Sequence, residues 1–271
     1  MNLSIVTTTF NSSLTIEKFV YEISETLKQQ NINTYEIIIV DDGSIDDTCK
    51  KLKKIKKEYA NLNIFELSKN FGHHRALITA LEFSKYDKIL CIDSDLEENP
   101  SDLKLFLNEI GQYDFIYGVQ KKRSASFLTN MFGNLFYKYF NFFSPIKIPK
   151  NLTTMTLMNN NVRDELIKFK ETEIFFHGIL HTIGFKKKPI LIEKKFKGKS
   201  EYTISKKIIK LTFLTCFLPF LLISCGKGVA ARKYPPQPEL RVKKNMEEGR
   251  GFRLGETFGG KSTTYEFASS N

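Results

Sequence analysis

The first hundred residues alternate between strand-like and helix-like hydrophobic periods, and this alternation constrains the fold more than any other feature of the chain. The strand-like runs are continuously apolar, which is typical of strands covered on both faces. Between them, apolar residues recur three or four positions apart, first at Ile16, Phe19, Val20, Ile23 and Leu27. This order predicts an α/β fold, a doubly wound, mostly parallel sheet flanked by helices. The predicted strands are Leu3–Thr9, Tyr35–Val40, Asn63–Leu67 and Lys88–Asp93.

Three further helices are predicted from the same spacing and from residues that favour helix starts. The segments Asp47–Tyr59 and His74–Ser84 have helical periodicity, and Asp46 or Asp47 is a suitable N-cap for the first of them. Another helix is predicted to open at Asn99-Pro100, because Asn is a good N-cap and Pro fits the first turn.

Acidic residues follow two of the predicted strands. Asp41 and Asp42 come at the end of the second strand, in "VDDGSIDDT", and Asp93 and Asp95 come at the end of the fourth. In a doubly wound sheet, ligands bind beyond the carboxyl ends of the strands. We therefore expect the two acidic loops to contribute to a single site. The structural alternative for "VDDGS" is an Asx-turn that closes an ordinary loop.

The stretch "CIDSDLEENP" concentrates negative charge in a chain whose formal net charge is +11. Acidic residues placed near a helix N-terminus gain well under ~1 kcal/mol per charge, which is too little to explain four crowded carboxylates. Mg²⁺ and Mn²⁺ prefer oxygen ligands and can share them with phosphate oxygens. The stretch therefore predicts a divalent metal at Asp93 and Asp95, while Glu98 is interpreted as part of the helix start.

Several motifs, taken in this order, resemble glycosyltransferase family 2, in the branch of the dolichol-phosphate mannosyltransferases and bacterial polyprenyl-phosphate glycosyltransferases. They are "SIVTTTFN", "IIIVDDGSIDDT", "LSKNFGHHRALITAL", "CIDSDLEENP", "NFFSPIKIPKNLTTMTLMNNNV" and "GKSEY", and the resemblance covers about residues 3–222. It implies a GT-A fold and an inverting, metal-dependent transfer from a nucleotide-diphosphate sugar, such as a UDP- or GDP-sugar, to a polyprenyl phosphate. Mn²⁺ or Mg²⁺ would be the cofactor.

The resemblance also implies roles for individual residues. The metal and the donor diphosphate would be held by Asp93, Asp95 and Glu97. Arg123 would face the acceptor phosphate, so that Asp95 and Arg123 are the residues expected nearest the reaction. The nucleotide sugar would be bound by Thr8, Phe10, Asn11, Asp41, Asp42, Lys69, Asn70, Gly72, Arg75, Asp93, Ser94, Lys199, Ser200 and Tyr202.

Departures from the family pattern leave the acceptor open. Gln120 stands where an Arg is common, and Glu201 replaces the Lys of a Ser-Lys-Tyr motif. A saccharide hydroxyl generally needs a base, whereas a polyprenyl phosphate is already ionised. The loop expected at Thr153–Thr156 has no carboxylate, which favours the phosphate acceptor. The alternatives are a saccharide acceptor in surface-polysaccharide assembly, with His177 or His181 as base, and a degenerate homologue that only binds nucleotide sugars.

The second half of the chain contains two long apolar segments and a polar end. Ala125–Phe143 is interpreted as a buried helix, or as one that dips into a membrane surface or an acyl-chain groove. Ile208–Ser224 is interpreted as a membrane-interfacial segment. We therefore expect a glycosyltransferase domain at 1–207, an interfacial segment at 208–225 and a flexible tail at 226–271. Because "MNLSIVTTTF" lacks the features of a signal peptide, the expected location is the cytoplasmic face of the membrane. No nucleic-acid readout motif accompanies the basic charge.

Overall fold

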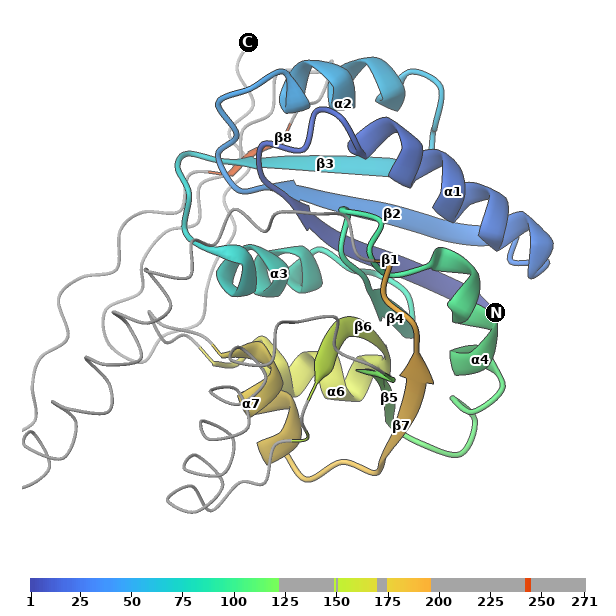
Figure 1. The fold of residues 1–271 in the computed structure, drawn as a ribbon. Coiled ribbons are helices and arrows are strands. Elements are labelled where there is room, and N and C mark those ends of the chain that lie inside the picture. The colour runs from blue at the N-terminus through green and yellow to red at the C-terminus, as the bar shows by residue number, and fades with distance from the viewer. Residues whose placement is uncertain (122–148, 150, 170–174, 196–241, 245–271) are drawn as a thin grey trace, which may run out of the picture. The chain divides into compact units, whose positions relative to one another are not determined.

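The computed structural model describes residues 1–121, 149, 151–169, 175–195 and 242–244 (Figure 1). All of them belong to one compact unit, Met1–Lys195 with Glu239–Asn271, and a second unit comprises Phe196–Pro238. Within the described ranges, eight strands form one sheet in the order β7-β5-β6-β4-β1-β2-β3-β8. The strands are β1 (Asn2–Thr9), β2 (Thr34–Asp41), β3 (Leu62–Leu67), β4 (Lys88–Cys91), β5 (Phe115–Gln120), β6 (Leu152–Asn159), β7 (Lys187–Ile192) and β8 (Val242–Lys244).

The centre of the sheet is parallel, as the sequence predicts. β1 pairs in parallel with β2 and with β4, so Ile5 lies opposite Ile37 on one side and Leu90 on the other. β3 continues the sheet in the same direction. Every residue of β1 after Asn2 is buried, which explains its run of apolar residues and threonines. The fourth strand is shorter than predicted and ends at Cys91, because the chain there turns into the acidic loop.

Helices cover both faces of the sheet, as predicted (Figure 1). The helices are α1 (Ile16–Gln29), α2 (Thr48–Lys56), α3 (His73–Glu82), the 3-10 turn η1 (Pro100–Asp102), α4 (Leu103–Leu107), α6 (Asn160–Leu166) and α7 (Phe176–Thr182). Apolar side chains of α1, α2 and α4, such as Phe19 and Leu52, form one core cluster with one face of the strands. Those of α3, α6 and α7, such as Leu77 and Phe176, form a second cluster on the other face.

The helix start predicted at Asn99-Pro100 is confirmed. The Asn99 side chain accepts a hydrogen bond from the backbone N–H of Ser101 at 3.2 Å, and Pro100 occupies the first turn. That turn is a 3-10 turn, which leads directly into α4. The cap fixes the point at which the acidic loop ends.

The threonine-rich segment Thr153–Thr156 lies within strand β6, so the expectation of a loop was wrong. β6 runs antiparallel between β4 and β5, with Leu157 opposite both Leu90 and Ile116. Threonine is β-branched and favours a pleated strand, and Met155, the one apolar residue of this segment, packs into the core. Because the segment is mostly polar, its sequence does not predict a strand inside the sheet.

Most predictions for the second half of the chain lie outside the described residues. These are Ala125–Phe143, Ile208–Ser224 and nearly all of 226–271. Within that last range, Val242–Lys244 forms β8, which pairs antiparallel with β3. Among the described helices, none has the length and hydrophobicity of a transmembrane span.

Candidate active site

Three neighbouring parallel strands end at the same edge of the sheet and bring the two acidic loops together. β1 lies between β2 and β4, and Thr9 is in register with Asp41. The backbone N–H of Asp42 donates to the carbonyl of Thr9 at 2.8 Å. From the other side, the Ser94 hydroxyl donates to the carbonyl of Thr8 at 2.7 Å. Both acidic loops are therefore fastened to the end of β1.

Asp42 connects the end of β2 to the loop before α3. Its two carboxylate oxygens accept hydrogen bonds from the backbone N–H groups of Phe71 and Gly72, at 2.7 Å and 2.9 Å. The side chain is buried, and this burial raises its pKa despite the two hydrogen bonds. These contacts present Lys69 and Asn70, both exposed, at the edge of the site.

Asp41 and Asn11 connect the loops that follow β1 and β2. The Asp41 carboxylate accepts hydrogen bonds from the backbone N–H and the hydroxyl of Ser44, at 2.9 Å and 2.5 Å. The backbone N–H of Asn11 donates to the Ser44 hydroxyl, and its side-chain oxygen accepts from the N–H of Ile45. Phe10, between these loops, is 40% exposed. In this structure the two carboxylates after β2 position loops, and their contact with a nucleotide stays a prediction.

Gly43 allows the close approach of these two loops. Its φ is +74°, and a Cβ added there would lie 2.5 Å from the carbonyl carbon of Lys69 and 2.8 Å from the nitrogen of Asn70. Both neighbours are backbone atoms, so a side chain at this position would displace the loop that Asp42 holds.

We expect Gly43→Ala to destabilise the protein by about 3 kcal/mol, from the left-handed conformation and the backbone clash together. Gly184→Ala is the matched control, because Gly184 has a φ of +78° and an added Cβ would have no neighbour within 4 Å. The control should cost only about 1–2 kcal/mol. Urea unfolding of both variants measures the difference, and equal losses would show that the loop approach contributes nothing.

The acidic loop after β4 is folded around Glu98. This side chain is fully buried, and its two oxygens accept hydrogen bonds from the backbone N–H groups of Asp93 and Met155, both at 3.2 Å. Leu96 has a φ of +62°, which turns the chain so that Glu98 points back into the loop. The interpretation of Glu98 as part of the helix start was therefore wrong: it joins the acidic loop to β6.

Lys194, which follows β7, supplies positive charge to this loop. Its Nζ lies 3.4 Å from Glu98 Oε1, 3.8 Å from Asp93 Oδ2 and 3.9 Å from Glu97 Oε2. Burial raises the pKa of Asp93 and of Glu98. The carboxylates of Asp95 and Glu97 raise the pKa of Asp93 further, and Asp93 raises that of Glu98, while Lys194 opposes both shifts. Lys194 is not predicted from the sequence, because it is one of many lysines in its segment and no local signal distinguishes it.

The predicted metal ligands do not form a complete protein cage. Among the described residues, no three His, Cys, Asp or Glu side chains come together as a metal site, and Asp93, Asp95 and Glu97 are no exception. Asp93 is half-buried and Asp95 is exposed, so their carboxylates lie at the surface of the loop. Any divalent ion here would need further ligands from a bound molecule.

His73 lies between the end of β1 and the acidic loop after β4. Its Nδ1 is 2.8 Å from the Thr8 hydroxyl, and its Nε2 is 3.6 Å from Asp93 Oδ1. Burial lowers the pKa of this imidazole below its ordinary value. The contact of His73 with Thr8 spans 65 residues, so no local feature of the sequence indicates it.

The two histidines considered as base candidates, His177 and His181, both lie on α7. Burial lowers the pKa of His177 to about 3 and that of His181 to about 4. The His181 ring packs edge-on to Tyr117 at 4.7 Å between centroids, and neither of its nitrogens has a hydrogen-bond partner among the described residues. A general base is most effective with a pKa near the operating pH. Neither imidazole is therefore tuned for that role.

The lowered pKa of His181 predicts a change in the pH dependence of stability. In the unfolded chain this side chain has its ordinary pKa of 6.5, so stability is lost as the pH falls from 6.5 towards 4. We expect His181→Leu to remove about 1–2 kcal/mol of that loss at pH 5. Above pH 7, the free energy of unfolding should depend on pH in the same way in the variant and in the parent protein. Urea unfolding at pH 5 and pH 8 tests this, since Asp93 and Glu98 affect both proteins equally. A constant difference between the proteins would contradict it.

Several predicted site residues cannot be placed. Arg123, Lys199, Ser200 and Tyr202 lie outside the described residues. Arg75 is half-buried in the first turn of α3.

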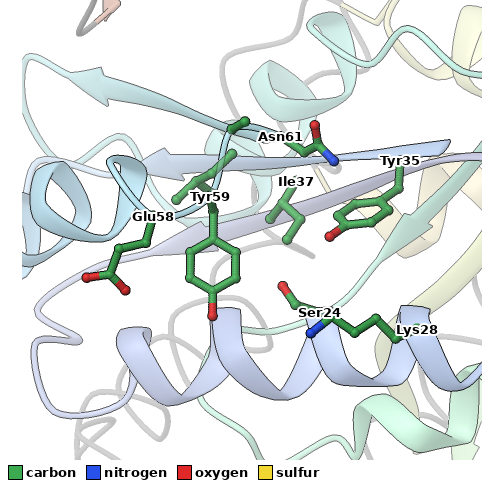
Figure 2. A pocket seen from close by; sticks show the side chains of 9 residues that line it. Ser24, Lys28, Tyr35, Ile37, Glu58, Tyr59 and Asn61 are labelled. Carbon is green, nitrogen blue, oxygen red and sulfur yellow. The ribbon is translucent and has the colours of Figure 1, made fainter. Parts of the chain in front are cut away.

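A cavity of about 250 Å³ lies away from this edge, between α1, the first half of β2 and the loop that leads into β3 (Figure 2). Ser24 and Lys28 of α1 face Tyr35 and Tyr59 across it. None of the predicted site residues lines this cavity, so the site is built from strand ends and loops rather than from the cavity.

Comparison with known proteins identifies the family and the fold. The family model for glycosyl transferase family 2 matches residues 4–187. A protein of Mycobacterium tuberculosis named as a glycosyltransferase is 30% identical, over 78% of this chain and 62% of that protein. A prophage bactoprenol glucosyl transferase homologue of Escherichia coli is 28% identical, over 69% of this chain and 61% of that protein. The chain thus spans less than two thirds of the length of these relatives.

A solved structure shares the fold. It is the mannosyltransferase PcManGT of Pyrobaculum calidifontis, in complex with GDP-Man and Mn²⁺. The match has a TM-score of 0.57 and 15% identity, and it covers 84% of this chain and 65% of that one. The predicted α/β fold of the GT-A type is confirmed.

Proposed function

This chain belongs to glycosyltransferase family 2, and from that premise we propose that it transfers a sugar from a nucleotide-diphosphate sugar to a polyprenyl phosphate. The donor would be a UDP- or GDP-sugar. The acceptor is suggested by the name of the bactoprenol glucosyl transferase homologue among its relatives. An acceptor of this kind would place the protein at the cytoplasmic face of a membrane.

The observation that carries the proposal is the joining of three strand ends into one site. His73 contacts the hydroxyl of Thr8 on β1 and the carboxylate of Asp93 after β4, while Asp42 after β2 holds the loop that leads to His73. We assign the nucleotide to the side of Thr8 and Asp42, where Phe10, Lys69 and Asn70 are exposed. The donor diphosphate is assigned to the side of Asp93 and Asp95.

The carboxylates of this loop fit a divalent ion of the Mg²⁺ or Mn²⁺ type. Such ions are often held by one or two carboxylates together with substrate phosphates, so a site without three gathered protein ligands suits them. Asp93 and Asp95 would hold the ion, with Glu97 as a third oxygen ligand. When bound there, the ion would neutralise charge on the departing nucleotide diphosphate.

We assign a phosphate acceptor because none of the base candidates considered among the described residues is suited to deprotonate a saccharide hydroxyl. Segment Thr153–Thr156 of β6 carries no carboxylate, and the lowered pKa values of His177 and His181 make their imidazoles weak bases. A phosphate acceptor is already ionised, and one of its oxygens would attack the anomeric carbon as the bond to the diphosphate breaks, with inversion. Arg123 is proposed to face that phosphate.

The test is transfer of labelled sugar to polyprenyl phosphate in detergent or membrane extract, across UDP-, GDP- and dTDP-sugars with Mn²⁺. We expect a lipid-linked product with at least one donor. A His177→Phe variant should keep transfer within about threefold of the parent protein, because general-base loss would instead cost about 10²-fold or more. Formation of product only with a saccharide acceptor, or a large loss in His177→Phe, would overturn the assignment of the acceptor.

A further inference from the structure

Lys194 lies where three carboxylates converge. Its side chain is 18% exposed, and its Nζ is within 4 Å of oxygens of Asp93, Glu97 and Glu98. Each of the three distances, 3.4–3.9 Å, exceeds an ordinary hydrogen bond, so the ammonium is shared among the acids rather than committed to one. Its charge acts on the whole loop.

The backbone fixes the position of this ammonium. The N–H of Lys195 donates to the carbonyl of Glu97 at 2.8 Å, which ties the segment after β7 to the acidic loop. Glu98 is held in turn by the backbone of Asp93 and of Met155 on β6. The fold therefore fixes the position of Lys194 beside the acidic loop.

Two of the three carboxylates around Lys194 are proposed metal ligands. A divalent ion bound by Asp93 and Glu97 would have to share their negative charge with an ammonium a few ångströms away. Positive charges at such distances repel by about 1 kcal/mol or more for each pair of unit charges, even in water. The lysine must therefore weaken binding of the ion, unless a third negative group enters. The donor diphosphate would be such a group.

We propose that Lys194 is a resident cation of the acidic loop: it weakens binding of a free divalent ion and contributes directly to binding of the donor diphosphate. The inference rests on the proposed function, which assigns a diphosphate to this loop. It predicts that the affinity for nucleotide depends only modestly on the divalent ion, because the Lys194 ammonium already supplies positive charge to the diphosphate. Without this ammonium, the affinity for nucleotide should depend more strongly on the ion.

The first measurement uses the full chain and Mn²⁺ alone, with free Mn²⁺ quantified by electron paramagnetic resonance. We expect Lys194→Met to bind Mn²⁺ about tenfold more tightly than the parent protein. Lys195→Met is the matched control, because it removes the same charge from the neighbouring, exposed residue. The control should change Mn²⁺ affinity by less than about twofold, since an exposed charge is well screened.

The second measurement is binding of UDP and GDP by calorimetry, with Mn²⁺ and with EDTA. In EDTA, Lys194→Met should lose about tenfold or more in nucleotide affinity, whereas Lys195→Met should lose less than about twofold. With saturating Mn²⁺, the Lys194→Met deficit should shrink. Activity is not needed for either measurement.

Because Lys194→Met leaves Glu98 buried without its partner, a double variant Glu98→Gln/Lys194→Met keeps the local charge balanced and protects the test against a folding defect. It should bind Mn²⁺ about tenfold more tightly than Glu98→Gln alone, and this comparison isolates the effect of the ammonium. Mn²⁺ binding that is absent, or that is not tightened by Lys194→Met in either background, overturns the inference. Absence of nucleotide binding by a parent protein that does bind Mn²⁺ in the expected order would instead overturn the proposed function.

Discussion

Glu98→Ala is expected to lower the free energy of unfolding by about 3–5 kcal/mol, the loss that follows when one partner is removed from a buried ion pair. The substitution removes the acceptor of two backbone N–H groups, those of Asp93 and Met155. It also leaves Lys194 with fewer opposite charges in a site that is only 18% exposed. The measurement is urea unfolding near pH 8, where the carboxylate is most fully ionised despite its raised pKa.

Glu97→Ala is the control for this prediction. Glu97 is adjacent in sequence and also lies within 4 Å of Lys194 Nζ, but its side chain is 35% exposed. Ion pairs of this exposure contribute about 0–1 kcal/mol, so the control should stay within that range. If both variants lost the same free energy, burial of Glu98 would not be the reason for its importance.

The parallel core of the fold follows directly from local sequence signals. A continuous apolar run such as Tyr35–Val40 indicates a strand buried on both faces. Helical spacing such as that of Ile16–Leu27 indicates a helix buried on one face, and the structure confirms both. The position of the site follows too, because carboxylates at the ends of β2 and β4 can only meet at one edge of a parallel sheet. These inferences need no knowledge of contacts distant in sequence.

The rest of the site depends on such distant contacts. β6 enters the centre of the sheet 60 residues after β4, and no signal in Thr153–Thr156 distinguishes a central strand from a polar loop. Glu98 is one of four acids in six residues, and only its contacts with Met155 and Lys194 separate it from the others. The acidic loop is therefore predictable from the sequence, whereas the one acid that folds inward is not.

The same limit affects the acids after β2. Asp41 and Asp42 could accept hydrogen bonds from a ribose or a nucleobase, and their residue type and position in the sequence predict that role. In the structure their oxygens are engaged by Ser44, Phe71 and Gly72. A carboxylate that positions a loop and one that binds a ligand occur at the same strand end, and residue type alone does not separate the two.

Asp93→Asn should separate catalysis from stability. We expect the proposed sugar transfer to fall about 10²–10³-fold, because the variant loses charge at the proposed site of the metal and diphosphate. The contact of Asp93 with Glu98 is made by its backbone N–H, which the variant keeps. The charge of Asp93 also raises the pKa of Glu98, so its removal relieves a repulsion inside the loop. Stability should therefore be unchanged or higher.

Asp87→Asn is the control, because Asp87 is exposed just before β4, at the end of the strand opposite to the site. It carries the same change of charge and should alter both transfer rate and stability little. The measurements are initial rates of labelled-sugar transfer and urea unfolding of the same preparations. A parallel loss of activity and stability in Asp93→Asn would indicate that this carboxylate holds the loop together. A loss of activity alone would assign it to the chemistry, because Glu98 and Lys194 would then suffice to keep the loop in place.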